Sequence, residues 1–134
     1  MKDFRYCIWL TPIDSNDIWY TYTNGFEPHV TLCYNLDEHS ISDKINTIDD
    51  YQVDITLEDE IIESCEDGFY ALYFNIKDIQ KKKWLPKNAH VSFLYKYSPI
   101  TELEKENLIK KITTKTTKFG ILKVKKCTGH FKEW

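Results

Sequence analysis

Residues 29–35 read His-Val-Thr-Leu-Cys-Tyr-Asn, and a similar pattern returns at residues 90–96 as His-Val-Ser-Phe-Leu-Tyr-Lys. Both stretches are rich in β-branched and aromatic residues and start with alternating polarity, which is typical of β-strands. The two histidines lie 61 positions apart in a chain of 134 residues, close to half its length. We interpret the pair as an internal pseudo-repeat in which each half of the chain supplies one strand that opens on a histidine.

The alternation of side chains along a strand predicts what each copy presents. His29, Thr31 and Cys33 fall on one face of the first strand, with Val30, Leu32 and Tyr34 on the other. His90 and Ser92 share a face of the second strand in the same way. If the two halves face each other across a pseudo-two-fold axis, two imidazoles and two hydroxyls converge on one point.

Strand-like and helix-like segments follow one another along the rest of the chain. Periodicity and turn residues indicate further strands over 4–10, 51–57, 59–64, 69–76 and 118–127, and helices over 14–22, 38–49 and 100–113. The last helix has an apolar stripe made of Leu103, Leu108, Ile109 and Ile112. No Gly/Ser-rich or Pro-rich linker divides the chain, so we expect residues 1–134 to form a single domain.

The charge is distributed unevenly along the chain. Residues 1–67 carry 3 Lys/Arg and 16 Asp/Glu, a net of −13, whereas residues 68–134 carry 15 and 5, a net of +10. One interpretation is that the two halves attract each other within the fold. The other is that the basic half gathers a phosphate-bearing ligand. An extended nucleic-acid duplex is disfavoured because the acidic half repels a long polyanion.

Cysteine spacing and hydropathy favour an intracellular protein. The four cysteines (Cys7, Cys33, Cys65 and Cys127) are widely spread without a CxxC pair, so we expect reduced thiols and neither a disulfide framework nor a zinc site. No signal peptide or membrane span is evident, which predicts a cytoplasmic monomer without membrane partners. The chain has 17 Lys to a single Arg and 15 Ile to 2 Ala, a bias typical of an A+T-rich coding sequence, as in large DNA viruses, phages and some parasites. In a viral member, the location is the cytoplasm of the host cell.

Two histidines paired with two hydroxyls suit the cleavage of a phosphodiester. A neutral histidine takes a proton from the attacking water or ribose hydroxyl, while a protonated one gives a proton to the leaving oxygen. The hydroxyls of Thr31 and Ser92 donate to the non-bridging phosphate oxygens as charge develops there. Such a site requires no metal or other cofactor.

The tetrads His29-Val30-Thr31-Leu32 and His90-Val91-Ser92-Phe93 resemble the paired signatures of the 2H phosphoesterase superfamily, the LigT-like or 2′,5′ RNA ligase-like group. The resemblance implies a bilobal, pseudo-two-fold α+β fold with two antiparallel sheets flanking a central cleft and helices outside. It also implies that His29 and His90 are the acid–base pair and that Thr31 and Ser92 bind the phosphate. Members cleave 2′,3′-cyclic phosphates, 2′-5′ linkages or cyclic nucleotide messengers, and several viral and phage members disarm nucleotide-based immune signalling. The short chain favours a small nucleotide substrate over a tRNA-sized one.

The alternation of side chains along the strands also indicates candidate substrate-binding residues. Arg5 and Trp9 fall on the cleft face of the first strand, and Tyr73 falls on the cleft face of strand 69–76. The two aromatic residues are candidates for stacking on a nucleobase, although both also suit ordinary packing. Lys123, with Lys125 on the same face of the last strand, is a candidate for steering phosphate, with a solvated face as the alternative.

Three other functions stay open on the sequence. The fold could clasp a nucleotide or an RNA end without turnover, or serve as a purely structural α+β domain. A Cys-His hydrolase built on Cys33 is disfavoured, because a thiol in the middle of a strand lacks the helix N-terminus or adjacent base that activates a nucleophile. His39 and His130 lie outside any motif and are treated as bystanders.

Overall fold

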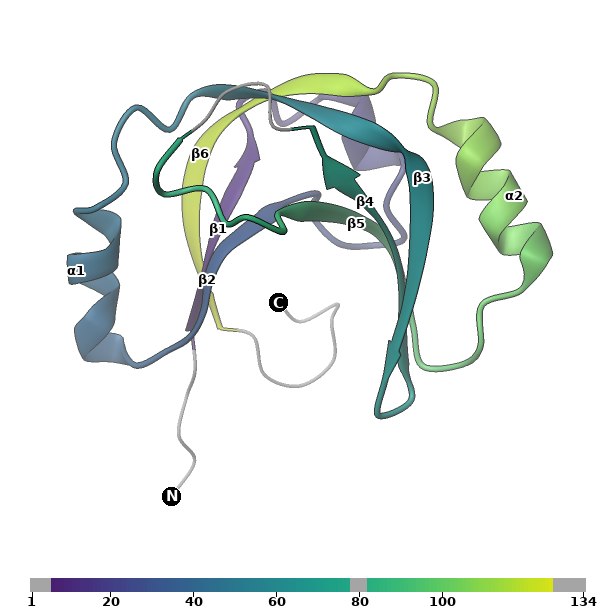
Figure 1. Ribbon diagram of the computed structural model, residues 1–134, viewed down its shortest axis with the longest axis horizontal. Coiled ribbons are helices and arrows are strands. Elements are labelled where there is room, and N and C mark those ends of the chain that lie inside the picture. Colours follow the sequence, from purple (N-terminus) through teal and green to yellow (C-terminus); the bar gives the residue numbers. More distant parts are fainter. Residues whose placement is uncertain (1–5, 78–81, 127–134) are drawn as a thin grey trace.

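The computed structural model describes residues 6–77 and 82–126, which form six antiparallel strands with short helices outside them (Figure 1). The strands are β1 (Tyr6–Pro12), β2 (Val30–Leu36), β3 (Val53–Glu66), β4 (Phe69–Ile76), β5 (His90–Lys96) and β6 (Thr116–Lys126). The helical segments are the 3₁₀ turns η1 (Ile18–Thr21) and η2 (Glu38–Ser40) and the α-helices α1 (Ile41–Ile45) and α2 (Glu102–Lys111). This mostly antiparallel architecture is consistent with the expected α+β class.

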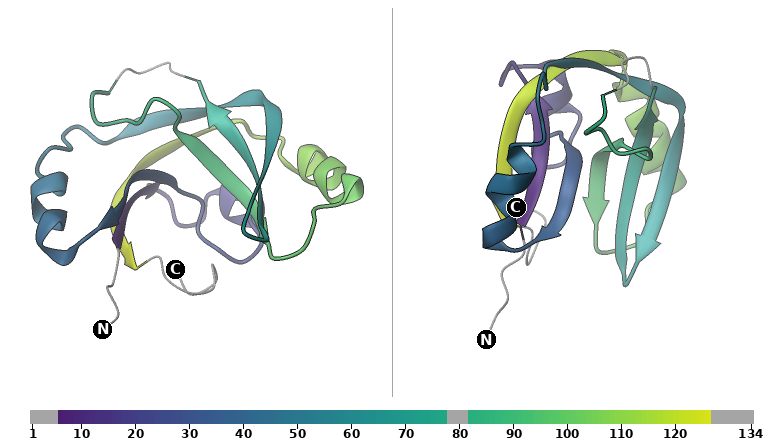
Figure 2. Two further views of the ribbon diagram at one scale, coloured as in Figure 1. Left: turned by 60° about the horizontal axis from the view of Figure 1, so that its bottom comes forward. Right: turned by 60° about the vertical axis from the view of Figure 1, so that its left-hand side comes forward.

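The described strands close into one barrel in the order β1-β2-β5-β4-β3-β6. The expected separation into two sheets is therefore not seen. Instead, β6-β1-β2 and β5-β4-β3 form two groups of three strands, which lie on opposite sides in the right-hand view of Figure 2. The groups are joined along β3 and β6 by four register pairs from Val53↔Phe119 to Thr56↔Thr116, but β2 and β5 share the single pair Val30↔Val91. The seam between β2 and β5 is thus the shorter of the two.

One continuous apolar core holds the two groups of strands together. Alternate residues of every strand point into it, as the period of two predicted. Trp19 of η1 is fully buried there and contacts Phe93 and Phe119 edge to face, while its indole Nε1–H donates to the carbonyl of Thr114 at 2.9 Å. A single 3₁₀ turn therefore connects β5, β6 and the segment after α2 through one side chain.

The helices are shorter than the periodicity predicted. Only Ile18–Thr21 of the expected 14–22 is helical, starting where Asp17 caps the turn by accepting from the Trp19 N–H. The expected helix 38–49 consists of η2 and the five-residue α1, whose isoleucines are only partly buried. Little packing supports more turns, and most helical stability in proteins comes from packing.

The region expected as two strands, 51–57 and 59–64, is one strand, β3, with a register shift between Leu57 and Ile61. The acidic run at residues 58–60 is exposed at this shift, so the chain bulges outward there without ending the strand. The hairpin with β4 turns at Asp67 and Gly68, as the turn residues predicted, and both have positive φ values.

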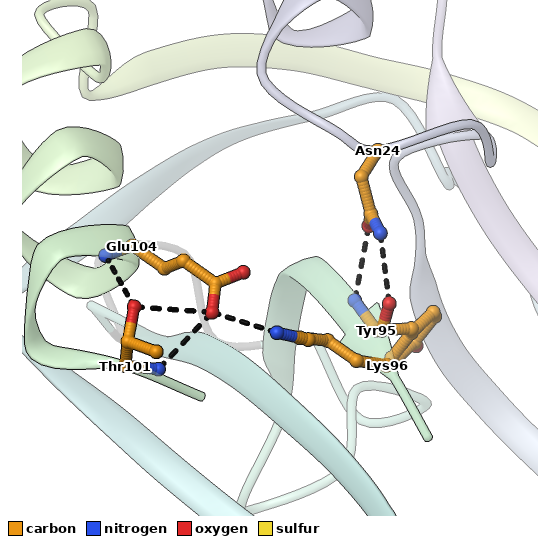
Figure 3. Close-up of polar contacts among 5 residues, drawn as sticks. All are labelled: Asn24, Tyr95, Lys96, Thr101 and Glu104. Carbon is orange, nitrogen blue, oxygen red and sulfur yellow. Dashed lines mark hydrogen bonds and ion pairs between the residues drawn. The ribbon is translucent and has the colours of Figure 1, made fainter. Parts of the chain in front are cut away.

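Helix α2 begins with a complete capping box (Figure 3). The Thr101 hydroxyl accepts from the Glu104 N–H at 3.1 Å, and the Glu104 carboxylate accepts from the Thr101 N–H at 3.1 Å and from Lys96 Nζ at 2.7 Å. Of the predicted apolar stripe, Leu108 and Ile112 are buried, whereas Leu103 and Ile109 are exposed. Leu108 and Ile112 are four residues apart and share the one narrow face that the helix turns to the barrel.

Asn24 connects the loop before β2 to the edge of β5 (Figure 3). Its side-chain amide donates to the Tyr95 carbonyl at 2.8 Å and accepts from the Tyr95 N–H at 3.0 Å. The amide thus replaces the backbone partner that β2 does not supply beyond Val30↔Val91. Among the helices of the described ranges, none is long and apolar enough to cross a membrane.

Candidate active site

The short seam between β2 and β5 brings the two tetrads together. Val30 and Val91 form its register pair, and both are fully buried in the core. Paired residues of an antiparallel ladder step in opposite directions, so His29 lies beside Ser92, and Thr31 lies beside His90, on the face opposite the core. The residues that the sequence singled out as catalytic are therefore neighbours across one strand pair.

His29 is held in a dry environment. Only 5% of its surface is exposed, and its ring stacks on the Trp9 indole with centroids 3.5 Å apart and planes 7° from parallel. Its Nδ1 lies 2.7 Å from the Glu27 carbonyl oxygen, which only accepts hydrogen bonds, so Nδ1 carries the hydrogen and the lone pair of the neutral ring is on Nε2. Burial lowers the pKa of His29 to about 4, although the hydrogen bond to Glu27 opposes this shift. The imidazole is therefore neutral at pH 7.

His90 has the same local arrangement in an open environment. Its Nδ1 lies 3.2 Å from the Asn88 carbonyl, again two residues earlier, and its ring centroid is 4.5 Å from that of Tyr73 at 45°. Tyr73 on β4 pairs with Ser92, as Trp9 on β1 pairs with Thr31. The pseudo-repeat thus extends to an aromatic residue on each neighbouring strand. His90 differs from His29 in being exposed to solvent.

The Glu27 side chain organises the surroundings of His29. Its carboxylate is ion-paired with Lys123 and accepts from the Tyr20 hydroxyl at 2.9 Å, and Lys125 Nζ lies 4.0 Å from it. Burial, with the nearby Glu27, raises the pKa of Tyr20, so this hydroxyl stays a donor. Because the Glu27 carbonyl also holds His29, one residue joins β6 to the His29 imidazole. Neither Glu27 nor Tyr20 belongs to a sequence motif that would have marked it.

The structure changes the interpretation of two predicted substrate-binding residues. Trp9 lies on the predicted face, but it is 2% exposed, with His29 against its ring and Lys125 Nζ 5.5 Å from the ring centroid. In this arrangement it supports the imidazole and has no open face for a nucleobase. Lys123 lies opposite Trp9 on β6 and is neutralised by Glu27, which weakens it as a phosphate-steering residue.

Two further residues, Tyr73 and Arg5, were predicted to bind substrate. Tyr73 is partly exposed beside His90, which keeps it available as a substrate contact. Arg5 lies outside the described residues. Within the described ranges, no group of three or more His, Cys, Asp or Glu side chains is placed to hold a metal ion.

A cavity of about 650 Å³ opens beside Thr31 and His90. It lies between β2 and the loop that leads into β5, and its lining includes Tyr34 and Lys87. Strand parity had placed Tyr34 on the apolar face, but its side chain is 76% exposed. The alternation fails because the pairing of β1 with β2 is irregular here and the next residue, Asn35, has a positive φ of 59°.

No protein-family model matches the sequence, and no curated protein matches it in sequence. The fold is similar to a solved structure of Kluyveromyces marxianus Usb1, with a TM-score of 0.50, 13% sequence identity and 96% of each chain covered. A second structure of that protein, with uridine monophosphate, gives a TM-score of 0.48 and 14% identity over 96% of each chain. At these identities the likeness concerns the fold.

Proposed function

We propose that this protein is a metal-independent phosphodiesterase that cleaves a small nucleotide by two-histidine acid–base catalysis. The observation that carries the proposal is the Val30↔Val91 pair, from which we infer that the two tetrads lie side by side at the β2–β5 seam. Both imidazoles use Nδ1 to bind a backbone carbonyl, which leaves Nε2 of each ring for proton transfer. A phosphate between the two strands would meet two proton-transfer groups and two hydroxyls.

We assign the base role to the histidine that burial keeps neutral. Nε2 of His29 takes the proton of the attacking water or ribose hydroxyl. His90 takes the complementary role of the acid, and its Nε2–H gives a proton to the leaving oxygen. The new P–O bond forms as the P–O bond to the leaving group breaks, and proton exchange with water then resets both rings.

The hydroxyls of Thr31 and Ser92 donate to the non-bridging oxygens of the same phosphate. Their hydrogen bonds strengthen as negative charge builds on these oxygens in the transition state, which lowers the barrier to reaction.

The comparison with known structures supports this reaction class at the level of the fold. This chain shares a fold with Usb1 of Kluyveromyces marxianus. Its two tetrads separately carry the resemblance to the 2H phosphoesterase superfamily. The substrates we propose are cyclic dinucleotides, 2′-5′-linked oligonucleotides and 2′,3′-cyclic phosphates, with an immune signalling nucleotide as the biological target.

The decisive experiment incubates the protein with a panel of these three substrate types in the presence of EDTA and identifies products by mass. We expect turnover that survives the chelator, is lost in His29→Ala and in His90→Ala, and is unchanged in His39→Ala, an exposed histidine outside the site. Loss of turnover with EDTA would show that the mechanism needs a metal. Tight nucleotide binding without product would identify a binding module, and neither binding nor turnover would refute the proposal.

A further inference from the structure

The cavity beside the catalytic residues exists because β2 and β5 separate after one register pair. Continued pairing would set Cys33 opposite Asn88 and Tyr34 opposite Lys87. Instead, the Ala89 N–H donates to the Pro86 carbonyl at 3.2 Å, and the Ala89 carbonyl accepts from the Ile76 N–H at 3.2 Å. The segment before β5 is therefore held by its own turn and by β4, and it leaves β2 across the cavity.

The lining of this cavity combines three kinds of surface. Thr31 and His90 supply the proposed phosphate-binding and proton-donating groups. Tyr34, 76% exposed, supplies an aromatic ring, and the exposed Lys87 supplies a cation. The rest of the lining is largely apolar: Leu32, Cys33, Pro86 and Ala89. At about 650 Å³, the cavity has the size of a small-molecule site, for which roughly 300–1,000 Å³ is usual.

We propose that this cavity binds the nucleoside attached to the scissile phosphate, with its base stacked on Tyr34 and a second phosphate bound by Lys87. This inference rests on the proposed function, because it takes Thr31 and His90 as the phosphate end of the site. An aromatic ring, an apolar slot and a cation around one phosphate position match the parts of a nucleotide that carries more than one phosphate. Of the two residues that the sequence proposed for base stacking, Trp9 is buried against His29, and Tyr73 does not line this cavity. The Tyr34 ring lines the cavity and is open to solvent.

The proposal predicts different effects for the two residues. Stacking on Tyr34 is independent of the number of phosphates, so its loss weakens binding of every substrate that has a base. The Lys87 ammonium acts only on a substrate with a second phosphate, and its contribution falls as salt is added. The preferred substrates are therefore oligonucleotides or cyclic dinucleotides rather than mononucleoside cyclic phosphates.

The test compares Tyr34→Ala, Tyr34→Phe and Lys87→Ala with two matched controls that lie outside the cavity lining. Tyr97→Ala removes another exposed tyrosine beyond the other end of β5, and Lys110→Ala removes an exposed lysine of α2. KM and kcat are measured on the best substrate of the panel. Dissociation constants for uridine and adenosine 5′-monophosphates, and for the corresponding 5′-phosphorylated dinucleotides, which carry two phosphates, are measured by calorimetry.

We expect Tyr34→Ala to raise KM and the dissociation constants roughly 5- to 150-fold, the range of base–aromatic stacking, while Tyr34→Phe and both controls stay near wild type. Lys87→Ala should weaken only dinucleotide binding and reduce its salt dependence. If Tyr34→Ala is as harmless as Tyr97→Ala while the histidine variants are inactive, the subsite is wrong and the proposed function stands. If no substrate is turned over but nucleotide binding depends on Tyr34, the function is wrong and the subsite stands.

Discussion

The two halves of the molecule place their histidines in the same way but surround them differently. Each imidazole lies at the start of a strand, binds the carbonyl two residues earlier and contacts an aromatic residue of the neighbouring strand. His29 is 5% exposed and stacked flat on Trp9, whereas His90 is open to solvent beside a tilted Tyr73 ring. The repeated motif sets the position of each imidazole, and the packing around it sets its acid–base character.

The strand beyond each aromatic residue explains part of this difference. Trp9 has β6 beside it, where Lys123 lies opposite and Lys125 Nζ is 5.5 Å from the indole centroid. Tyr73 has β3 beside it, where its partner is Ile62 in the projecting hairpin, and it remains partly exposed. A buried stack in one half and an open pair in the other give two identical side chains different environments.

Some charges of the acidic and basic halves of the chain form ion pairs with each other in the fold. Ion pairs join the acidic half to the basic half at Glu27–Lys123, Asp50–Lys82 and Glu63–Lys105. The interpretation of mutual attraction thus has direct support at these positions. Attraction of a phosphate-bearing ligand by the basic half stays a prediction, and Lys87 at the cavity is the residue on which we test it.

The largest expected effect separates the acid from the base. His90→Ala should lower kcat roughly 10²- to 10⁴-fold on a substrate with a ribose leaving group, as loss of a general acid does. On a nucleotide p-nitrophenyl ester, whose leaving group needs no proton, the same variant should return to within about tenfold of wild type. His29→Ala should stay inactive on both substrates, because the nucleophile still needs a base. The release of nitrophenolate measures the rate on the ester. If His29→Ala is rescued on this substrate and His90→Ala is not, the two roles are exchanged.

The aromatic partners should differ in their contributions to stability. Trp9→Ala empties a buried site and should lower the free energy of unfolding by about 3–5 kcal/mol, whereas Tyr73→Ala, at a partly exposed site, should cost about 1 kcal/mol. Urea unfolding at pH 7 measures both values. NMR titration should also show the pKa of His29 rising in Trp9→Ala, because water enters the site, with a smaller change in Trp9→Phe. Equal costs for the two alanine variants would contradict the difference in burial between the halves.

The smallest expected effect is the dependence of stability on pH. Burial lowers the pKa of His29 from 6.5 to about 4 in the folded protein, so between these values the unfolded chain binds a proton that the folded protein excludes. Stability should therefore fall as the pH falls through this window, by about 3 kcal/mol from this residue. Unfolding free energies of wild type and His29→Gln, compared from pH 7 to 4, isolate the contribution. Identical slopes for wild type and His29→Gln would show that His29 is not buried in solution.

Local pattern predicted the two strands that follow His29 and begin at His90, because a strand depends on short-range alternation. The strand at 90–96 has its predicted bounds, and the face of Trp9 and Tyr73 follows from parity along β1 and β4. The alternation of side chains does not predict which segments pack against a given face of the strand, so the burial of Trp9 was not predicted. The alternation also fails where pairing is irregular, and this is why Tyr34 emerged only from the structure.

The sequence by itself determined that two His-x-Thr/Ser strands exist and that each presents an imidazole and a hydroxyl together. Only the tertiary structure decided that β2 and β5 meet at a single pair, that Glu27 binds Lys123 across 96 positions of sequence, and that a cavity opens between Tyr34 and Lys87. The side chains of a strand alternate because of backbone geometry, which any local segment carries. The environment of a histidine depends on contacts between distant segments, which form only when the barrel closes.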